Sequence, residues 1–261
     1  MKIKFWGVRG SIPAPIAFAE IEQKILKALL DAQDIDLSNE QAVQEYVKQL
    51  PPLSRGTVGG NTPCISVQVG DEWVIFDAGS GLRVLGWELM KGAFGRGRGI
   101  AHIFISHTHW DHIQGYPFFV PASVSGNQIN IYRPVPDLKE RFEGQQVPEY
   151  FPKTLDYARA DVNFIQLKEN TPIHVAGVQV NNILQAHPGR SYGYRLDGQG
   201  AAIVYASDAE YKDLGEAHTQ RYVEFMRGAD LLVFDAQYTL ADTWDRLDWG
   251  HSSSVIGVDM A

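Results

Sequence analysis

Four potential metal ligands lie within six consecutive residues, 107–112, which read His-Thr-His-Trp-Asp-His and follow a short apolar run. Imidazole nitrogens and carboxylate oxygens are the ligands expected for zinc or a similar divalent ion. Because alternate residues of an extended segment point the same way, His107 and His109 are placed to bind one ion. If a helix begins there, Asp111 and His112 turn toward a second ion. The alternative is a solvated histidine-rich turn.

The composition limits where such a site operates. A chain of 261 residues, 44% hydrophobic and 21% charged, is long enough for one large domain or two small ones. A net charge of −8 disfavours broad binding to nucleic acid or to anionic membranes, although a local basic pocket remains possible. No apolar run approaches the length that spans a membrane.

Two further features indicate the compartment. The chain has one cysteine, Cys64, so it forms no intrachain disulfide, which fits a reducing cytoplasm. Residues 1–6 lack the long apolar core and the cleavage site of a signal peptide. We therefore expect a cytoplasmic protein rather than a secreted one.

Residues 16–50 differ in pattern from the rest of the chain. Apolar residues recur there at helical spacing, which predicts a two-helix insertion after a first strand at residues 2–6. Ser38 and Gln41 have the spacing of a capping box for the second helix. The insertion is interpreted as a packed surface hairpin, or alternatively as a lid or a homodimer contact.

The remaining sequence is rich in short apolar runs typical of strands, with a few helices between them. Strands are predicted at residues 64–69, 73–76, 101–105, 129–132, 162–167, 178–183, 192–196, 201–205 and 231–234. Helices are predicted at residues 82–90 and 216–227, and residues 92–99 are predicted to form a flexible loop.

The motif at 107–112 resembles the signature of the metallo-β-lactamase superfamily of metallohydrolases. Further segments carry the resemblance along nearly the whole chain: 7–11 (Gly-Val-Arg-Gly-Ser), 59–62 (Gly-Gly-Asn-Thr), 76–81 (Phe-Asp-Ala-Gly-Ser-Gly), 186–189 (Ala-His-Pro-Gly), 206–208 (Ala-Ser-Asp) and 250–252 (Gly-His-Ser). The chain is most similar to the branch that holds ribonuclease Z and the cyclic phosphodiesterases. The resemblance implies an α/β fold, a single domain over 1–261 built as a four-layer αββα sandwich.

The resemblance also implies a ligand set for two divalent ions. His107, His109 and His187 would bind the first ion, Asp111 and His112 the second, and Asp208 would bridge both. Zinc is expected from these ligands, and manganese or iron would also fit. Asp111 would also orient the attacking water or accept its proton.

Three more residues are assigned through the same resemblance. His251 resembles a histidine near the scissile phosphate and Asp235 its acidic partner, a pairing that suits a general acid. His251 is alternatively a metal ligand or a helix cap, and Asp235 is alternatively scaffolding. Asp77 is expected to brace the metal loop, and Arg9 and Arg190 are candidates for receiving a phosphate.

The chain departs from that branch after Gly250, where a helix, another strand and a last metal-binding histidine are expected. The sequence stops inside the predicted helix, so we expect either that the chain is truncated, that His251 serves instead, or that a partner supplies the ligand.

The leading hypothesis is a dinuclear phosphodiesterase acting on a small or cyclic phosphodiester. The alternatives are a tRNA 3′ endonuclease, a glyoxalase-type thioesterase and a non-catalytic metal-binding regulatory protein. The endonuclease usually needs a protruding RNA-binding arm and a basic surface, and the sequence indicates neither.

Overall fold

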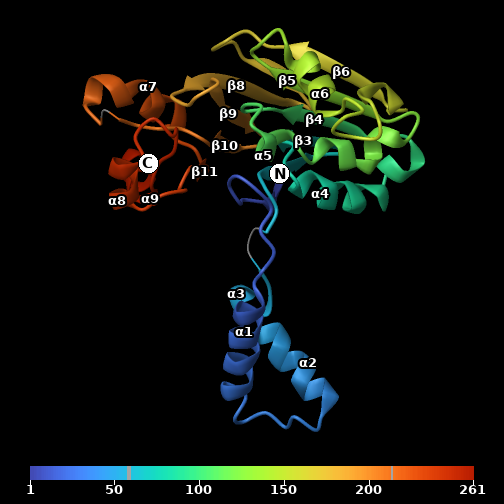
Figure 1. Cartoon of the computed structure of the whole chain (residues 1–261), viewed down its shortest axis with the longest axis vertical. Helices are drawn as coiled ribbons and strands as arrows, with labels where there is room; N and C mark the ends of the chain where they lie inside the picture. Colours follow the sequence, from blue (N-terminus) through green and yellow to red (C-terminus); the bar gives the residue numbers. More distant parts are fainter. Residues whose placement is uncertain (58–59, 213) are drawn as a thin grey trace.

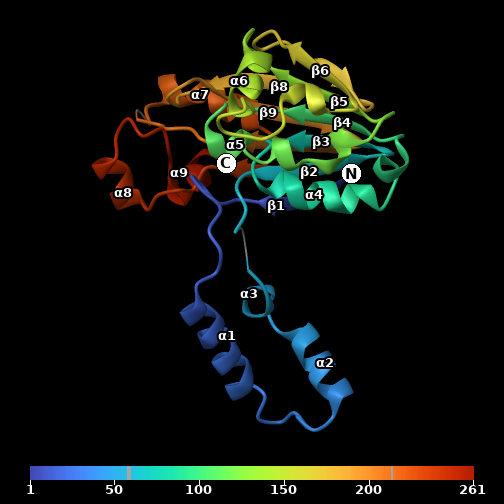
Figure 2. The ribbon, with the colours of Figure 1, turned by 45° about the vertical axis from the view of Figure 1, so that its right-hand side comes forward.

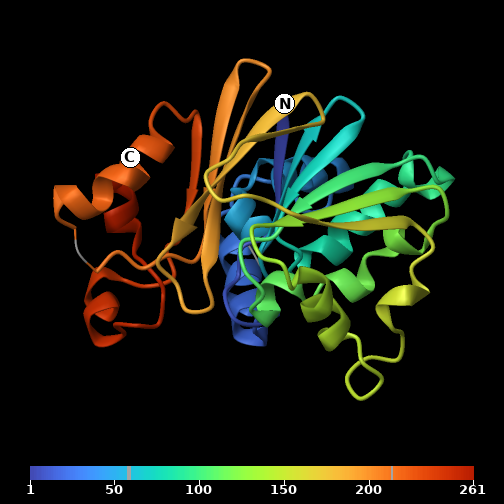
Figure 3. The same ribbon diagram turned by 90° about the horizontal axis from the view of Figure 1, so that it is seen from above.

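The computed structural model describes residues 1–57, 60–212 and 214–261 and contains two β-sheets that face each other (Figures 1 and 3). The first sheet has the order β1 (Lys2–Gly7), β2 (Cys64–Val69), β3 (Glu72–Phe76), β4 (Ile100–Phe104), β5 (Gln128–Arg133), β6 (Asp161–Gln166). The second has the order β11 (Leu231–Phe234), β10 (Ala201–Ala206), β9 (Ser191–Gly198), β8 (Val178–Gln185), β7 (Ile173–Val175).

Helices cover the outer faces of both sheets. The longer ones on the body are α4 (Gly81–Met90), α6 (Leu138–Gln145), α7 (Glu216–Met226) and α9 (Ser254–Met260). The shorter ones are α5 (Trp110–Ile113), α8 (Leu240–Asp245), η1 (Phe94–Arg96), η2 (Tyr116–Phe118), η3 (Val120–Ser123) and η4 (Leu155–Tyr157). The predicted αββα architecture is confirmed. The expected loop at 92–99 contains instead the 3₁₀ turn η1, which is anchored by the buried Phe94.

Stacked aromatic rings fill the space between the sheets. Phe76 on β3 stacks on Tyr205 of β10 with ring centroids 5.3 Å apart, and Phe104 on β4 meets Tyr194 of β9 edge-on at 5.3 Å. The Tyr194 hydroxyl donates a hydrogen bond to the carbonyl of Ile105, 2.7 Å away, so its polar end is satisfied inside the core.

Strand direction decides where the site forms. β3, β4, β5 and β6 are parallel, and in the second sheet β10 is parallel to β11 and runs in the same direction as β8. The segments that follow β3, β4, β8, β10 and β11 therefore emerge at one edge of the sandwich. These are the segments in which the sequence analysis placed its candidate ligands and their supporting residues.

The insertion forms an arm that extends away from the sandwich (Figures 1 and 2). It contains α1 (Phe18–Leu30), α2 (Glu40–Gln49) and α3 (Pro52–Arg55). The hairpin does not lie packed on the body, and the expectation that the chain lacks a protruding arm was wrong. The spacing of apolar residues predicted the helices but could not show that their apolar side chains are exposed to solvent.

The arm is apolar and acidic at the same time. Among its described residues Ala32 alone is buried. The exposed apolar side chains are Phe18, Ile21, Ile25, Leu26, Leu29, Leu30, Leu37, Val47 and Leu53. Residues 16–57 carry seven Asp or Glu and four Lys or Arg. The arm therefore lacks the basic surface that a nucleic-acid clamp needs.

The cap of α2 differs from the predicted one. The Asn39 side chain, rather than that of Ser38, accepts hydrogen bonds from the backbone N–H groups of Gln41 and Ala42. The Ser38 hydroxyl donates to Asp36 instead. Either residue type is a favourable N-cap, and the turn before the helix decides which one is used.

No helix in the described ranges is both long enough and apolar enough to cross a membrane.

Replacing residues 16–57 with a short glycine-serine linker should leave the sandwich folded, because the arm contributes almost nothing to the buried core. We expect Tm to change by no more than about 3 °C, which is about 1 kcal/mol for a domain of this size. Calorimetry of the two proteins measures the change. A loss of cooperative unfolding would contradict the separation of arm and body.

Candidate metal centre

Three histidines from different segments meet at the sandwich edge. The candidate ligand atoms of His107 and His109, which follow β4, and of His187, which follows β8, all lie within 4.8 Å of one another. Nε2 of His187 is 3.2 Å from Nδ1 of His109. Nδ1 of His187 lies 2.7 Å from the Gly250 carbonyl, which fixes the proton on Nδ1 and leaves Nε2 free to face its neighbours.

Asp208 lies at the centre of the cluster. Its Oδ2 is 3.3 Å from Nε2 of His112, 3.6 Å from Nε2 of His107 and 4.0 Å from Nε2 of His187. The side chain follows β10 and is nearly buried. Burial opposes ionisation, but the adjacent His112 holds the pKa of Asp208 well below its ordinary value. An ionised carboxylate between two groups of histidines is suited to bridging two cations.

Two buried nitrogens in this cluster face a carboxylate without forming a hydrogen bond to it. Nε2 of His107 and Nε2 of His112 are inaccessible to solvent and make no hydrogen bond within the described part of the chain, although Oδ2 of Asp208 lies 3.6 and 3.3 Å away. Leaving a buried polar atom without a hydrogen bond costs about 1–3 kcal/mol. Burial, and next the neighbouring His112, lower the pKa of His107 well below its ordinary value, which favours the neutral ring that a metal ligand requires. Each of these two Nε2 atoms is therefore suited to binding a divalent ion.

The buried Asp77 fixes the orientation of His112. Its Oδ2 is 2.7 Å from Nδ1 of His112, so Nε2 points toward Asp208. The same carboxylate accepts hydrogen bonds from the backbone N–H and hydroxyl of Ser106 and from the hydroxyl of Tyr205. These contacts agree with the bracing role that the family resemblance implied for Asp77.

Asp111 lies beside these groups at the first turn of α5. Its Oδ2 is 3.5 Å from Nε2 of His112 and accepts a hydrogen bond from the backbone N–H of Ser11. Burial favours the neutral acid, but contact with His112 leaves the pKa of Asp111 below its ordinary value. Ser11 belongs to the segment that leads into the arm, so the base of the arm adjoins the cluster.

His251 and Asp235 form an adjacent pair. Nδ1 of His251 is 2.8 Å from Oδ2 of Asp235 and 3.9 Å from Oδ2 of Asp208. Burial alone would lower the pKa of His251, but the Asp235 carboxylate raises it above the ordinary value. His251, Asp235 and Asp208 also lie close enough together to hold an ion. The geometry therefore accommodates both interpretations of His251, as proton donor and as ligand.

Two supporting residues were not found from the sequence. Arg133, fully buried at the end of β5, donates to the Arg190 and Gly189 carbonyls and holds the turn after His187. Both Glu210 carboxylate oxygens accept backbone N–H groups, from Asp248 and from Gly250. A lone arginine after a strand and a lone glutamate in a loop have no spacing pattern, so no signal marked them.

Within the described residues, neither arginine side chain considered for phosphate binding forms a hydrogen bond or an ion pair with the histidine and aspartate cluster. Arg190 forms an ion pair with Glu169, and Arg9 is exposed in the segment after β1.

A family model described as a beta-lactamase superfamily domain matches residues 72–260. The chain belongs to this superfamily. Ribonuclease Z from Archaeoglobus fulgidus is 26% identical over 181 residues, which cover 67% of the present chain and 55% of that protein. The chain thus spans about half the length of the curated relatives it matches.

Solved structures share the fold of the chain. Human tRNase Z, short form, has a TM-score of 0.57 at 20% identity, covering 100% of the present chain and 88% of its own. The metallo-beta-lactamase fold protein YhfI from Bacillus subtilis has a TM-score of 0.56 at 22% identity, covering 77% and 73%. At these identities the likeness establishes the fold of this superfamily member and nothing finer.

Gly250 offers a test of the site in this superfamily member. Its φ is +84°, and a Cβ there would lie 2.2 Å from Nδ1 of His187. Gly250→Ala should displace His187 and weaken zinc affinity roughly 10- to 100-fold, the range for lost metal-supporting contacts. Competition against a chromogenic chelator measures the affinity.

Gly200→Ala is the matched control, because Gly200 has φ +76° and open space around its Cβ position. It introduces backbone strain of about 1 kcal/mol without the clash. Equal losses of zinc affinity in the two variants would refute a specific role for Gly250.

Proposed function

We propose that this chain is a metal-dependent hydrolase that cleaves a small or cyclic phosphodiester. The observation that carries the proposal is the buried Asp208 carboxylate between the two histidine groups, with Nε2 of His107 and of His112 buried beside it and making no hydrogen bond within the described structure. His107, His109 and His187 would hold one ion, and His112, Asp111 and Asp208 a second. Two bound divalent ions would supply an activated water and neutralise charge on the phosphate oxygens.

The side chains around that cluster divide the remaining work. Asp111, held by Ser11, is placed to orient a water or accept its proton. His251 has its Nδ1 against Asp235, so a protonated ring would donate from Nε2 to the departing alkoxide. Because Asp235 favours the charged imidazole, the pair is suited to general acid catalysis.

The charge distribution favours a small substrate. The chain has a net charge of −8, and the arm adds more acidic than basic residues. A long polyanion would be repelled by such a surface, whereas a small phosphodiester needs only local cations. A cytoplasmic location remains part of this proposal, consistent with the single cysteine.

Ribonuclease Z-type cleavage of RNA is the second candidate. The names of the curated relatives favour it, and so does the presence of a protruding arm. The acidity of that arm counts against it. Incubation of the protein with an unprocessed tRNA transcript distinguishes the candidates, because specific 3′ cleavage at a rate exceeding that of small diesters would favour the second.

His109→Ala should abolish hydrolysis of bis(p-nitrophenyl) phosphate and reduce bound metal from the two ions expected per chain. Metal content by mass spectrometry and release of p-nitrophenol measure both. His174→Ala, an exposed histidine in β7, is the control and should change neither. If the wild type binds metal but cleaves only thioesters, or cleaves nothing, the thioesterase or the non-catalytic alternative replaces this proposal.

His251→Ala should distinguish its two roles. A general acid contributes about 10²- to 10⁴-fold when the leaving group is a poor one. We therefore expect a loss of that size for a dialkyl phosphodiester, a much smaller loss for a p-nitrophenyl diester, and unchanged metal content. Equal losses for both esters together with loss of an ion would identify His251 as a ligand.

A further inference from the structure

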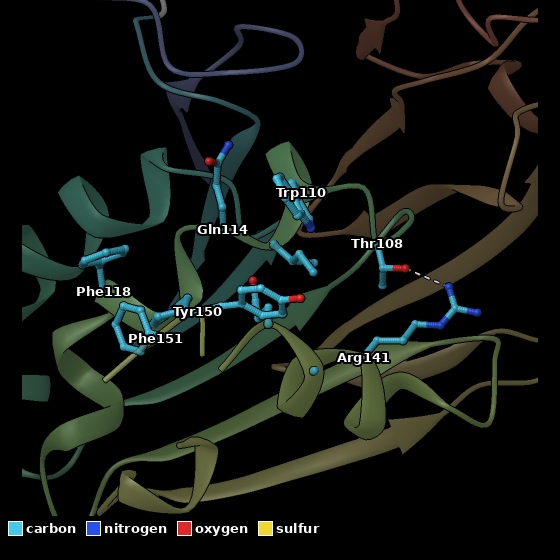
Figure 4. Close-up of a pocket in the computed structure, with 11 residues that line it drawn as sticks. Thr108, Trp110, Gln114, Phe118, Arg141, Tyr150 and Phe151 are labelled. Atoms are coloured by element: carbon cyan, nitrogen blue, oxygen red, sulfur yellow. Dashed lines mark hydrogen bonds between the residues drawn. The ribbon is translucent and has the colours of Figure 1, made fainter. Parts of the chain in front are cut away.

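An aromatic cavity of about 550 Å³ adjoins the metal-binding segment (Figure 4). Thr108 and Trp110, which line it, alternate in sequence with His107, His109 and Asp111. The opposite wall comes from α6 and the loop that follows it. The volume of the cavity falls within the range of about 300–1,000 Å³ typical of small-molecule sites.

The rings around this cavity are unusually exposed. Trp110 and Tyr150 are each 80% exposed and Phe118 is 52% exposed. Figure 4 shows Tyr150, Phe118 and Phe151 on one side of the cavity, with Trp110 at its upper edge. Phe118 and Phe151 pack edge to face, with centroids 5.4 Å apart, which holds that wall in place. Flat, accessible rings beside a reaction centre are suited to stacking against a planar group of a ligand.

One charged group in the lining limits what that ligand is. Arg141 forms an ion pair with Asp137 and donates to the Thr108 hydroxyl, 2.7 Å away, which places its guanidinium next to the metal-binding segment. The lining thus combines stacking surfaces with a cationic side chain on the side of the reaction centre.

We propose that this cavity binds the nucleobase of a nucleoside phosphodiester whose phosphate lies at the metal centre. A nucleobase offers a planar ring that stacks on Trp110 and Tyr150. Arg141 places a cation between the cavity and the metal-binding segment, on the side where the phosphate would lie. A purely alkyl group offers no planar face to these rings. The inference rests on the proposed function and narrows its substrate class to single nucleotides or short nucleotide diesters.

Two esters with the same leaving group test the cavity. Thymidine 5′-(p-nitrophenyl phosphate) and methyl p-nitrophenyl phosphate differ only in the group that the cavity would hold. The wild type should prefer the nucleoside ester in kcat/KM by roughly 5- to 100-fold, the range for one base–aromatic stack, mainly through KM. In Tyr150→Ala the ratio of kcat/KM for the two esters should fall toward one. Tyr157→Ala, an exposed tyrosine outside the cavity, should keep it.

A binding measurement separates failure of this inference from failure of the proposed function. Adenosine 5′-monophosphate, titrated into the full chain, should quench the emission of Trp110, and Trp110→Phe should remove that signal. Calorimetry should show weaker binding to Tyr150→Ala and unchanged binding to Tyr157→Ala. Such binding without turnover of either ester would retain the cavity assignment and overturn the hydrolase. Turnover with no nucleoside preference and no nucleotide binding would overturn the cavity assignment alone.

Discussion

The buried carboxylate of Asp77 is the interaction on which the two sheets and the metal centre both depend. It follows β3 directly and accepts hydrogen bonds from Ser106 after β4 and from the Tyr205 hydroxyl of β10, 2.6 Å away, in the opposite sheet. It also orients His112. A carboxylate in the interior is tolerated only when its oxygens are satisfied, because an unpaired one costs several kcal/mol. The packing of the sheets and the aim of a candidate ligand are thus fixed by the same few bonds.

Backbone strain gathers at the same edge. Ser11, Asp77, Arg190 and Asp208 all have positive φ, between 48° and 69°. Each such residue costs of order 1–3 kcal/mol and persists only where its surroundings hold it. Here those surroundings are side-chain hydrogen bonds: Asp77 is held by four donors, and Arg133 donates to the Arg190 carbonyl. Asp77 and Asp208 adopt this conformation within two residues of the ends of β3 and β10.

Much of this arrangement could be read from the sequence, and the remainder could not for identifiable reasons. Continuous apolar runs predicted the buried strands, and the motif at 107–112 predicted a metal site because its ligands are close in sequence. The contacts of Glu210 could not be predicted in this way, because its partners are backbone N–H groups 38 and 40 residues away, which leave no pattern in the sequence. The prediction that residues 16–50 pack on the body was wrong for another reason. An amphipathic period shows which residues share a helix face, but not whether another part of the chain covers that face.

The division of labour within the metal-binding segment bears on how specificity arises in this fold, which hosts many chemistries. In the extended part of the segment alternate side chains point to opposite sides. His107 and His109 face the metal cluster, while Thr108 faces the aromatic cavity and Trp110 continues its lining from the start of α5. One short stretch of backbone therefore positions both the ligands and part of the cavity wall. A substitution at 108 or 110 changes the shape and polarity of the cavity without removing a ligand. A substitution at 107 or 109 changes the cluster and leaves the cavity rings in place. Because the two sets of side chains share a backbone but not a direction, substrate preference and metal chemistry can vary separately on the same scaffold.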